Sequence, residues 1–228
     1  MMDKFPPAVL VRQAPFVLFM ILLVIRGALP DGGAIDSRWI YAVSTVTVGY
    51  SLIHLRRHYS ELHTFARPGA PGRLSSVAVS VLAGVVLFAL WIELNQPWMV
   101  MGQPTAVFKP VDAEGQLIWP LVVARWVGAT LVVPVMEELF WRSWLMRWID
   151  NPDFERVAPE AVSLKAMVIS SVAFTLVHNQ WVAAFIAGML FAAVYRHSRS
   201  LWMAILCHAV TNGVLGAWVL LTGNWQFW

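Results

Sequence analysis

Two adjacent glutamates and an arginine stand inside one apolar stretch of the sequence, "VVPVMEELFWRSWLM" (residues 132–146). Glu138 and Arg142 are four residues apart with the acid first, which is the spacing and order that favour an ion pair on a helix. Glu137 points about 100° away on the helical wheel and cannot share that pair as easily. A carboxyl group held out of water without a partner is suited to accept a proton and return it, so Glu137 is the candidate general base.

Three further polar candidates lie in the last third of the chain. His178 ends the apolar run "SSVAFTLVHNQW", and "LWMAILCHAVTNGVL" carries His208 and Asn212. Residues four apart share one face of a helix, so His208 and Asn212 point the same way. A lone histidine in an apolar helix is more often a packing residue than a catalyst. Two histidines, an asparagine and an unpaired glutamate in one apolar region favour a shared site.

The composition indicates that membrane helices carry these residues. The 228 residues are 59% hydrophobic and 13% charged, whereas a soluble domain is about half apolar and about a quarter charged. The apolar residues come in blocks long enough to cross a bilayer. The 13 tryptophans fit this class, because tryptophan is favoured at the membrane–water interface. We predict an all-α fold, a polytopic membrane helix bundle of about seven transmembrane helices, with eight as the alternative.

The apolar runs and their polar breaks predict the positions of these spans. One membrane domain, residues 1–228, contains seven, at roughly 13–29, 38–55, 74–93, 121–147, 164–178, 181–195 and 200–221. The fifth and sixth spans are short for full crossings. We therefore expect the "HNQ" turn between them to lie within the membrane, where it must line a wet cavity or be covered by protein.

The lysines and arginines predict the orientation. With the N-terminus in the cytoplasm, the alternating spans place eleven basic residues on the cytoplasmic side and four on the other, which satisfies the positive-inside rule. The cytoplasmic set is Lys4, Arg12, Arg56, Arg57, Arg67, Arg73, Arg147, Arg156, Lys165, Arg196 and Arg199, and the outer set is Arg26, Arg38, Lys109 and Arg125.

Depth in the membrane supports a shared site. Glu137 lies ten residues before Arg147, about 15 Å along a helix, and His208 lies nine residues after Arg199, about 14 Å. An ionisable group near the bilayer midplane costs several kcal/mol unless it is paired or wetted, and it is a functional candidate by default. His178 lies thirteen residues after Lys165, about 20 Å, which is a slightly poorer match. The polar side chains of three helices can therefore meet at similar depth.

Charge and cysteine content exclude other classes. The net charge of +3 comes without a basic stripe, so nucleic acid is not an expected partner. The single cysteine, Cys207, excludes an intrachain disulfide and a CxxC metal site. We expect Cys207 to be a packing residue, because a thiol buried among apolar groups is a poor nucleophile.

Three motifs resemble those of a known family. "EELFWR" (137–142), "FTLVH" (174–178) and "HAVTN" (208–212) resemble the Glu-Glu-x-x-x-Arg, Phe-x-x-x-His and His-x-x-x-Asn motifs of the CPBP intramembrane proteases. That family is also called Abi and includes the type II CAAX prenyl endopeptidases. The motifs occur in the same order, and the resemblance covers about residues 118–220. Among bacterial members, the sequence is similar to the CAAX protease-related subgroup.

The resemblance implies an enzyme that hydrolyses a peptide bond inside the membrane, near the C-terminus of a membrane-associated protein or peptide. Glu137, assisted by His178, would activate a water as general base and return the proton to the leaving amine. His208 and Asn212 would stabilise the tetrahedral oxyanion. Glu138 and Arg142 would orient their helix and tune the base.

The residues leave alternatives open. Glu137, His178 and His208 could instead bind zinc or another divalent metal that activates the water. The same scaffold could serve as a non-catalytic immunity or scaffold protein, or as a proton-coupled transporter, although no paired repeats are recognisable. The expected surroundings are membrane lipid and, from the resemblance, the bacterial cytoplasmic (inner) membrane.

Overall fold

The computed structural model describes residues 7–31, 36–65, 69–102 and 107–228. Within these ranges the chain is helical, and its only strand-like pairing is an isolated bridge between Val111 and Leu117. The predicted all-α fold is thus confirmed over this part of the chain. Lys4 and Arg67, both expected in the cytoplasm, lie outside the described residues.

The main helices follow the apolar runs of the sequence. They are α1 (Pro7–Gly27), α2 (Arg38–Leu55), α3 (Arg73–Glu93), α4 (Trp119–Val127), α5 (Val133–Glu138), α6 (Met146–Asp150), α7 (Leu164–Thr175), α8 (Trp181–Ser198) and α9 (Leu201–Thr222). Two π-helical segments, η4 (Gly128–Val132) and η5 (Leu139–Leu145), join α4, α5 and α6. Short 3₁₀ turns are η1 (Arg56–His58), η2 (Ser60–Leu62), η3 (Pro97–Met99), η6 (Phe154–Arg156), η7 (Pro159–Ala161) and η8 (Trp225–Phe227).

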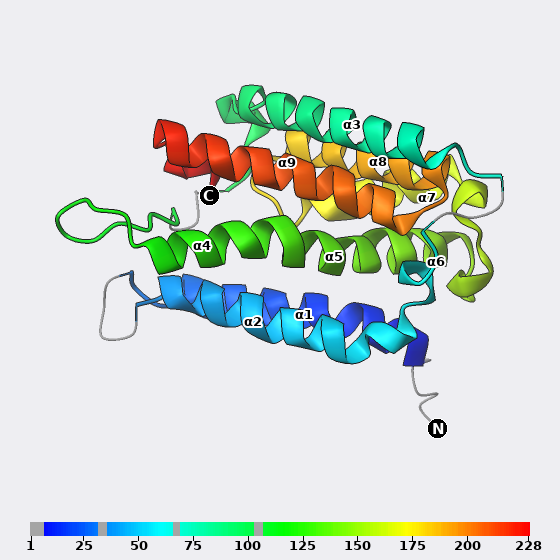
Figure 1. Cartoon of the computed structure of the whole chain (residues 1–228), viewed down its shortest axis with the longest axis horizontal. Helices are drawn as coiled ribbons and strands as arrows, with labels where there is room; N and C mark the ends of the chain where they lie inside the picture. Colours follow the sequence, from blue (N-terminus) through cyan, green and yellow to red (C-terminus); the bar gives the residue numbers. More distant parts are fainter. Residues whose placement is uncertain (1–6, 32–35, 66–68, 103–106) are drawn as a thin grey trace.

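The helix that runs from Trp119 to Asp150 is the axis of the bundle. Figure 1 shows it in green, with α1 and α2 along one side and α3, α8 and α9 along the other. Its 32 residues span about 48 Å, more than the roughly 30 Å of a hydrocarbon core. Pro134 lacks an N–H group and interrupts the α-helical pattern, and the π-helical segment η4 comes directly before it. The two predicted glutamates therefore occupy a short α-helical piece between two π-helical ones.

In the part of the chain that the structure describes, five helices are long and apolar enough to cross a membrane. They are Ala8–Gly27, Arg73–Glu93, Trp119–Asp150, Trp181–Ser198 and Leu201–Thr222. The runs expected at 38–55 and 164–178 also form helices, but α2 is interspersed with hydroxyl side chains and α7 ends at Thr175 after 12 residues. The predicted count of seven or eight spans is therefore not confirmed.

The connections between the helices lie at the two ends of the bundle. The connections α2–α3, α6–α7 and α8–α9 lie at the end where α1 begins, and the connections α1–α2 and α3–α4 lie at the opposite end (Figure 1). The turn between α7 and α8 falls short of that opposite end, because α7 is only 12 residues long.

Glycines allow two of the helix crossings to be close. A Cβ atom on Gly188 of α8 would lie 2.8 Å from the Cβ of Ser171 on α7. A Cβ atom on Gly84 of α3 would lie 2.6 Å from the backbone oxygen of Cys207 on α9, and Thr211 Oγ1 donates a hydrogen bond to the Gly84 oxygen at 3.0 Å. Cys207 is buried in this contact, as expected of a packing residue. Small residues of this kind let membrane helices approach each other closely.

Candidate active site

Glu138 is the charged centre of the candidate site. Its side chain is fully buried, and its Oε1 atom accepts hydrogen bonds from His208 Nδ1 at 2.9 Å and from Arg142 Nη1 at 3.3 Å. The Nε atom of Arg142 lies 3.2 Å from Glu138 Oε2, close enough for an ion pair, although that N–H group is not aligned for a hydrogen bond. The predicted Glu138–Arg142 pair is confirmed, and it also holds a histidine from another helix.

Arg142 joins η5 to α7 and α8. Its Nη2 atom donates to the backbone oxygen of Gly188 at 3.2 Å, and its guanidinium lies over the rings of Phe174 (4.9 Å) and Phe191 (5.2 Å). A guanidinium over an aromatic face gains a favourable electrostatic contact. A buried charge is tolerated when it is both paired and hydrogen-bonded, and Arg142 meets both conditions.

His208 is fixed in orientation from two sides. Its ring stacks on Phe191 with centroids 4.5 Å apart and planes 17° from parallel, while Nδ1 is bonded to Glu138. A carboxylate at Nδ1 selects the tautomer that carries the proton there. The ring nitrogen left to act on another molecule is therefore Nε2.

Glu137 is the carboxylate that the ion pair does not use. It is 7% exposed, and its Oε2 atom is buried without a hydrogen-bond partner among the described residues. His208, Glu138 and Arg142 are close enough to influence its charge. A buried polar atom without a partner is rare in native proteins and calls for an explanation. Glu137 is thus a buried carboxylate whose Oε2 atom has no hydrogen-bond partner among the described residues.

His178 lies beside this cluster and is oriented by its own helix. Its Nδ1 atom is 2.9 Å from the backbone oxygen of Phe174, and its ring packs on the Phe174 ring (4.3 Å) and against the edge of Trp91 (5.9 Å). The Nε2 atom is again the nitrogen left for chemistry. No hydrogen bond or ion pair joins His178 to Glu137 in the described part of the chain.

The turn that carries His178 is held by hydrogen bonds to α3 and the segment that follows it. Met101 donates its N–H group to Asn179 O at 2.7 Å, and Trp181 Nε1 donates to Trp98 O at 3.1 Å. Gln180 Nε2 donates to Trp91 O at 3.1 Å. The end of α3 and the segment after it therefore hold this turn in place.

Asn212 shares a face of α9 with His208, as predicted, but bonds to a different part of the central helix. Its Nδ2 atom donates to Ala129 O at 2.8 Å, nine residues before the Glu138 that holds His208. The N–H group of Val133 bonds to Gly128 O, and the next residue, Pro134, has no N–H group. Asn212 thus supplies a donor to a carbonyl group that the interrupted helix leaves without one.

The three residues considered as metal ligands do not form a metal-binding group. Where the structure describes the chain, no three His, Cys, Asp or Glu side chains lie together so that they could hold an ion. The arrangement of Glu137, His178 and His208 therefore does not fit a metal site.

Several residues that shape the site carry no signal in the sequence. Gly188 and Phe191 lie on α8, which contains none of the motifs, yet one binds Arg142 and the other contacts both Arg142 and His208. Trp91 and Gln180 contact or support His178, but neither belongs to a motif that would mark it in the sequence. Only their spacing of three residues places Gly188 and Phe191 on one helix face.

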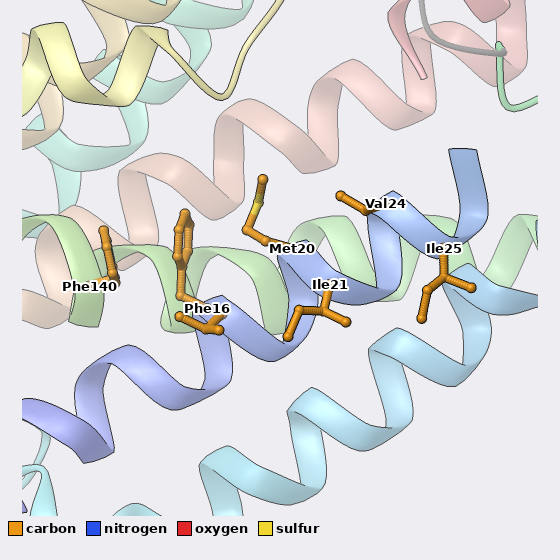
Figure 2. A pocket seen from close by; sticks show the side chains of 7 residues that line it. Phe16, Met20, Ile21, Val24, Ile25 and Phe140 are labelled. Atoms are coloured by element: carbon orange, nitrogen blue, oxygen red, sulfur yellow. The ribbon is translucent and has the colours of Figure 1, made fainter. Parts of the chain in front are cut away.

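A separate apolar hollow lies on the outside of α1 and does not belong to this site. Phe16 of α1 stacks on Phe140 of η5 there, with ring centroids 4.0 Å apart (Figure 2). The hollow has a volume of about 380 Å³ and is lined by Phe16, Val17, Met20, Ile21, Val24, Ile25 and Phe140. None of these side chains can transfer a proton or bind an ion, so the hollow offers no chemistry.

Fold and site together define a helical membrane protein with a buried Glu–Arg–His centre. Residues 119–214 match the family model described as Rce1-like, type II CAAX prenyl endopeptidase Rce1-like. Comparison with curated proteins and with solved structures gives no match. The matched residues contain all six predicted site residues, so the resemblance to the CPBP and type II CAAX endopeptidase family is confirmed for this part of the chain. With five helices able to cross a bilayer, it is an integral membrane protein.

Proposed function

We propose that the chain is an intramembrane endopeptidase that hydrolyses a peptide bond near the C-terminus of a membrane-associated protein or peptide. The observation that carries the proposal is Glu137, a buried carboxylate with an unpartnered oxygen beside a paired Glu138–Arg142–His208 cluster. Peptide hydrolysis requires two different roles of such carboxylates. One carboxylate is left for proton transfer, and a second orients a histidine.

In this mechanism Glu137 takes a proton from a water molecule, whose oxygen attacks the carbonyl carbon of the scissile bond. Glu137 then delivers that proton to the leaving amine. His178 assists Glu137 through its Nε2 atom, because Nδ1 is held by the Phe174 oxygen. The proton thus passes from the water to Glu137 and from Glu137 to the leaving amine, and no other proton donor is needed.

The oxyanion is stabilised by donors on α9. The Glu138 carboxylate holds the His208 ring at Nδ1, and the Nε2 side of the ring is the side that interacts with the developing negative charge. Asn212 uses one of its two amide hydrogens on Ala129, and the other contributes to the same oxyanion. Arg142 keeps Glu138 in place for this role.

The proposed setting is the bacterial cytoplasmic membrane, with the N-terminus in the cytoplasm and lipid around the bundle. The basic residues gathered at the end where α1 begins support this orientation. Large apolar side chains that are exposed on the helices, such as Val24 (71%) and Leu131 (60%), support lipid contact.

The test is peptide cleavage by the purified, lipid-reconstituted protein and its Glu137→Gln variant, followed by mass spectrometry of the products. Glu93→Gln is the matched control, because Glu93 is an exposed carboxylate at the end of α3. We expect cleavage by the wild type and the control, and none by Glu137→Gln. Cleavage by Glu137→Gln at the wild-type rate would contradict the base role. A folded wild type that cleaves no family-type peptide would favour a scaffold function.

A further inference from the structure

A buried ion pair at the end of the bundle where α1 begins lies outside the proposed active site. Arg12 of α1 and Glu61 of η2 form a two-pronged contact, with Nε 2.8 Å from Oε1 and Nη2 2.7 Å from Oε2. The side chain of Arg12 is fully buried and that of Glu61 is 5% exposed. Paired parallel hydrogen bonds of this kind fix the relative geometry of the two groups.

Ser143 is the third member of this contact and belongs to the central helix. Its Oγ atom donates to Glu61 Oε1 and accepts a hydrogen bond from Arg12 Nε at 3.1 Å. Ser143 is fully buried and is the residue directly after Arg142. Arg12, Glu61 and Ser143, here called the clamp, thus connect the N-terminal third of the chain to the helix that carries Glu137 and Glu138.

Arg12 makes further contacts with the residues around the clamp. Arg12 Nη1 donates to Ala8 O at 2.8 Å, and Nη2 lies 3.4 Å from Glu155 Oε1. The Arg12 guanidinium also lies 5.0 Å from the ring centroid of Phe154. In Figure 1 the helix α1, in blue, runs alongside the green central helix, so that the clamp bridges neighbouring helices.

The segment that the clamp grips is π-helical. The η5 segment spans Leu139–Leu145 and includes Arg142, so its register decides where that guanidinium points. π-Helical turns are rare and are found mostly as single turns inside α-helices, frequently at functional sites. Other side chains also hold this segment: Ser170 Oγ donates to Trp141 O at 3.3 Å, and Arg147 Nη1 donates to Ser143 O at 3.2 Å.

A buried ion pair adds little to stability compared with apolar side chains of similar volume, and its better-attested use is to specify one arrangement. Here the specified arrangement is the rotation of η5. A shift of this segment would carry Arg142 away from Glu138 and release the carboxylate that orients His208.

We propose that Arg12, Glu61 and Ser143 are positioning residues that hold η5 in the register at which Arg142 binds Glu138. The proposal rests on the endopeptidase function for its kinetic test, but not for its structural one. It makes the N-terminal helix, which lies outside the family match of residues 119–214, a necessary part of the active centre.

The kinetic test compares Ser143→Ala and Glu61→Gln with wild type, using kcat and KM for peptide cleavage. Ser143→Ala removes the link to η5 and leaves the Arg12–Glu61 pair in place. We expect kcat to fall about ten- to a hundredfold while KM stays within about twofold, because the reacting groups are misplaced and the substrate contacts are intact. Asp153→Asn is the matched control, since it breaks the exposed Arg156–Asp153 pair near the same end of the bundle.

The structural test needs no substrate. In NMR spectra of isotope-labelled histidine, the ring nitrogens of His208 report whether Nδ1 still donates to Glu138. We expect both clamp variants to shift the His208 signal, assigned through its loss in His208→Gln, and the Asp153→Asn control to leave it unchanged.

The two experiments together distinguish a failure of the endopeptidase proposal from a failure of the clamp proposal. A wild type that cleaves no peptide counts against the endopeptidase function, while a shifted His208 signal in Ser143→Ala still supports the clamp. Wild-type kcat and an unshifted His208 signal in Ser143→Ala would overturn the clamp. Should Glu61→Gln fail to fold, Ser143→Ala alone decides, because it keeps the ion pair.

Discussion

The Nδ1 atom of His208 lies 2.9 Å from Oε1 of Glu138, although the two residues are 70 positions apart in the chain. The contact makes the second glutamate of the pair the orienting group of a histidine. The first glutamate has an oxygen with neither a hydrogen bond nor an ion pair among the described residues, whereas Oε2 of Glu138 lies against Arg142. The two neighbouring carboxylates thus have different environments. Such a difference allows one carboxylate, Glu138, to serve as a fixed charge and the other, Glu137, as a proton acceptor.

The first prediction concerns the charge balance around Glu138. Glu138→Gln leaves Arg142 buried and charged without its carboxylate, so we expect a loss of about 3–5 kcal/mol in the free energy of unfolding. The double variant Glu138→Gln/Arg142→Met removes the stranded charge and should recover part of that loss without recovering cleavage. Denaturant unfolding of the detergent-solubilised variants measures both. A double variant less stable than Glu138→Gln would contradict the ion-pair explanation.

The second prediction concerns Asn212 and the proline of the central helix. Asn212→Ala takes the donor from Ala129 O, and a buried carbonyl group without a partner costs about 1–3 kcal/mol. Pro134→Ala restores an N–H group five residues after Ala129, within reach in a π-helical register. The double variant should therefore lose less stability than the sum of the two single variants. Simple additivity in unfolding experiments would show that Asn212 does not act through this carbonyl.

The helices and the local ion pair could be predicted from the sequence because both depend on short-range patterns. Apolar runs bounded by polar breaks predict helices, and the spacing of four between Glu138 and Arg142 predicts their contact. Counting residues from the flanking arginines likewise predicts how far Glu137 and His208 lie from those arginines along their helices. These quantities need no knowledge of how the helices are rotated.

The partners of the site residues could not be predicted, because they depend on that rotation. Two π-helical segments change the register of the central helix on either side of Glu137, and no residue pattern reveals them in advance apart from Pro134. Asn212 was expected beside His208 in an oxyanion site, yet its observed bond is to Ala129. The sequence also allows Glu137, His178 and His208 to bind a metal together, but among the described residues no three such side chains lie close enough to hold an ion.

The third prediction concerns the close approach of α7 and α8. Gly188→Ala places a Cβ atom 2.8 Å from that of Ser171, so α8 must move and carry the Gly188 oxygen away from Arg142. Overpacking of this kind costs about 1–3 kcal/mol, and we expect cleavage to fall with it. Gly27→Ala is the matched control, because nothing lies within 4 Å of a Cβ atom there. Equal melting temperatures and equal activity in the two variants would contradict the role of Gly188.

The last prediction concerns the pH dependence of folding that arises from Glu61, outside the membrane-spanning helices. Burial by itself raises the pKa of Glu61. The hydrogen bonds and charge of Arg12, with a hydrogen bond from Ser143, outweigh burial and lower the pKa from 4.5 to about 2. A lowered pKa in the folded state means that the ionised group stabilises the fold above the unfolded pKa. That stability is lost as the pH falls from about 4.5 to about 2.

The expected loss across this window is about 3 kcal/mol, the equivalent of the shift between the two pKa values. Unfolding free energies of the wild type and Glu61→Gln, measured at several pH values between about 2 and 6, test it. Glu61→Gln has no proton to gain, so its curve should be flatter than that of the wild type by this amount. Asp153→Asn, at an exposed ion pair, should follow the wild-type curve. Parallel curves for the wild type and Glu61→Gln would mean that Glu61 is not held ionised by Arg12, and the clamp would then lack its central ion pair.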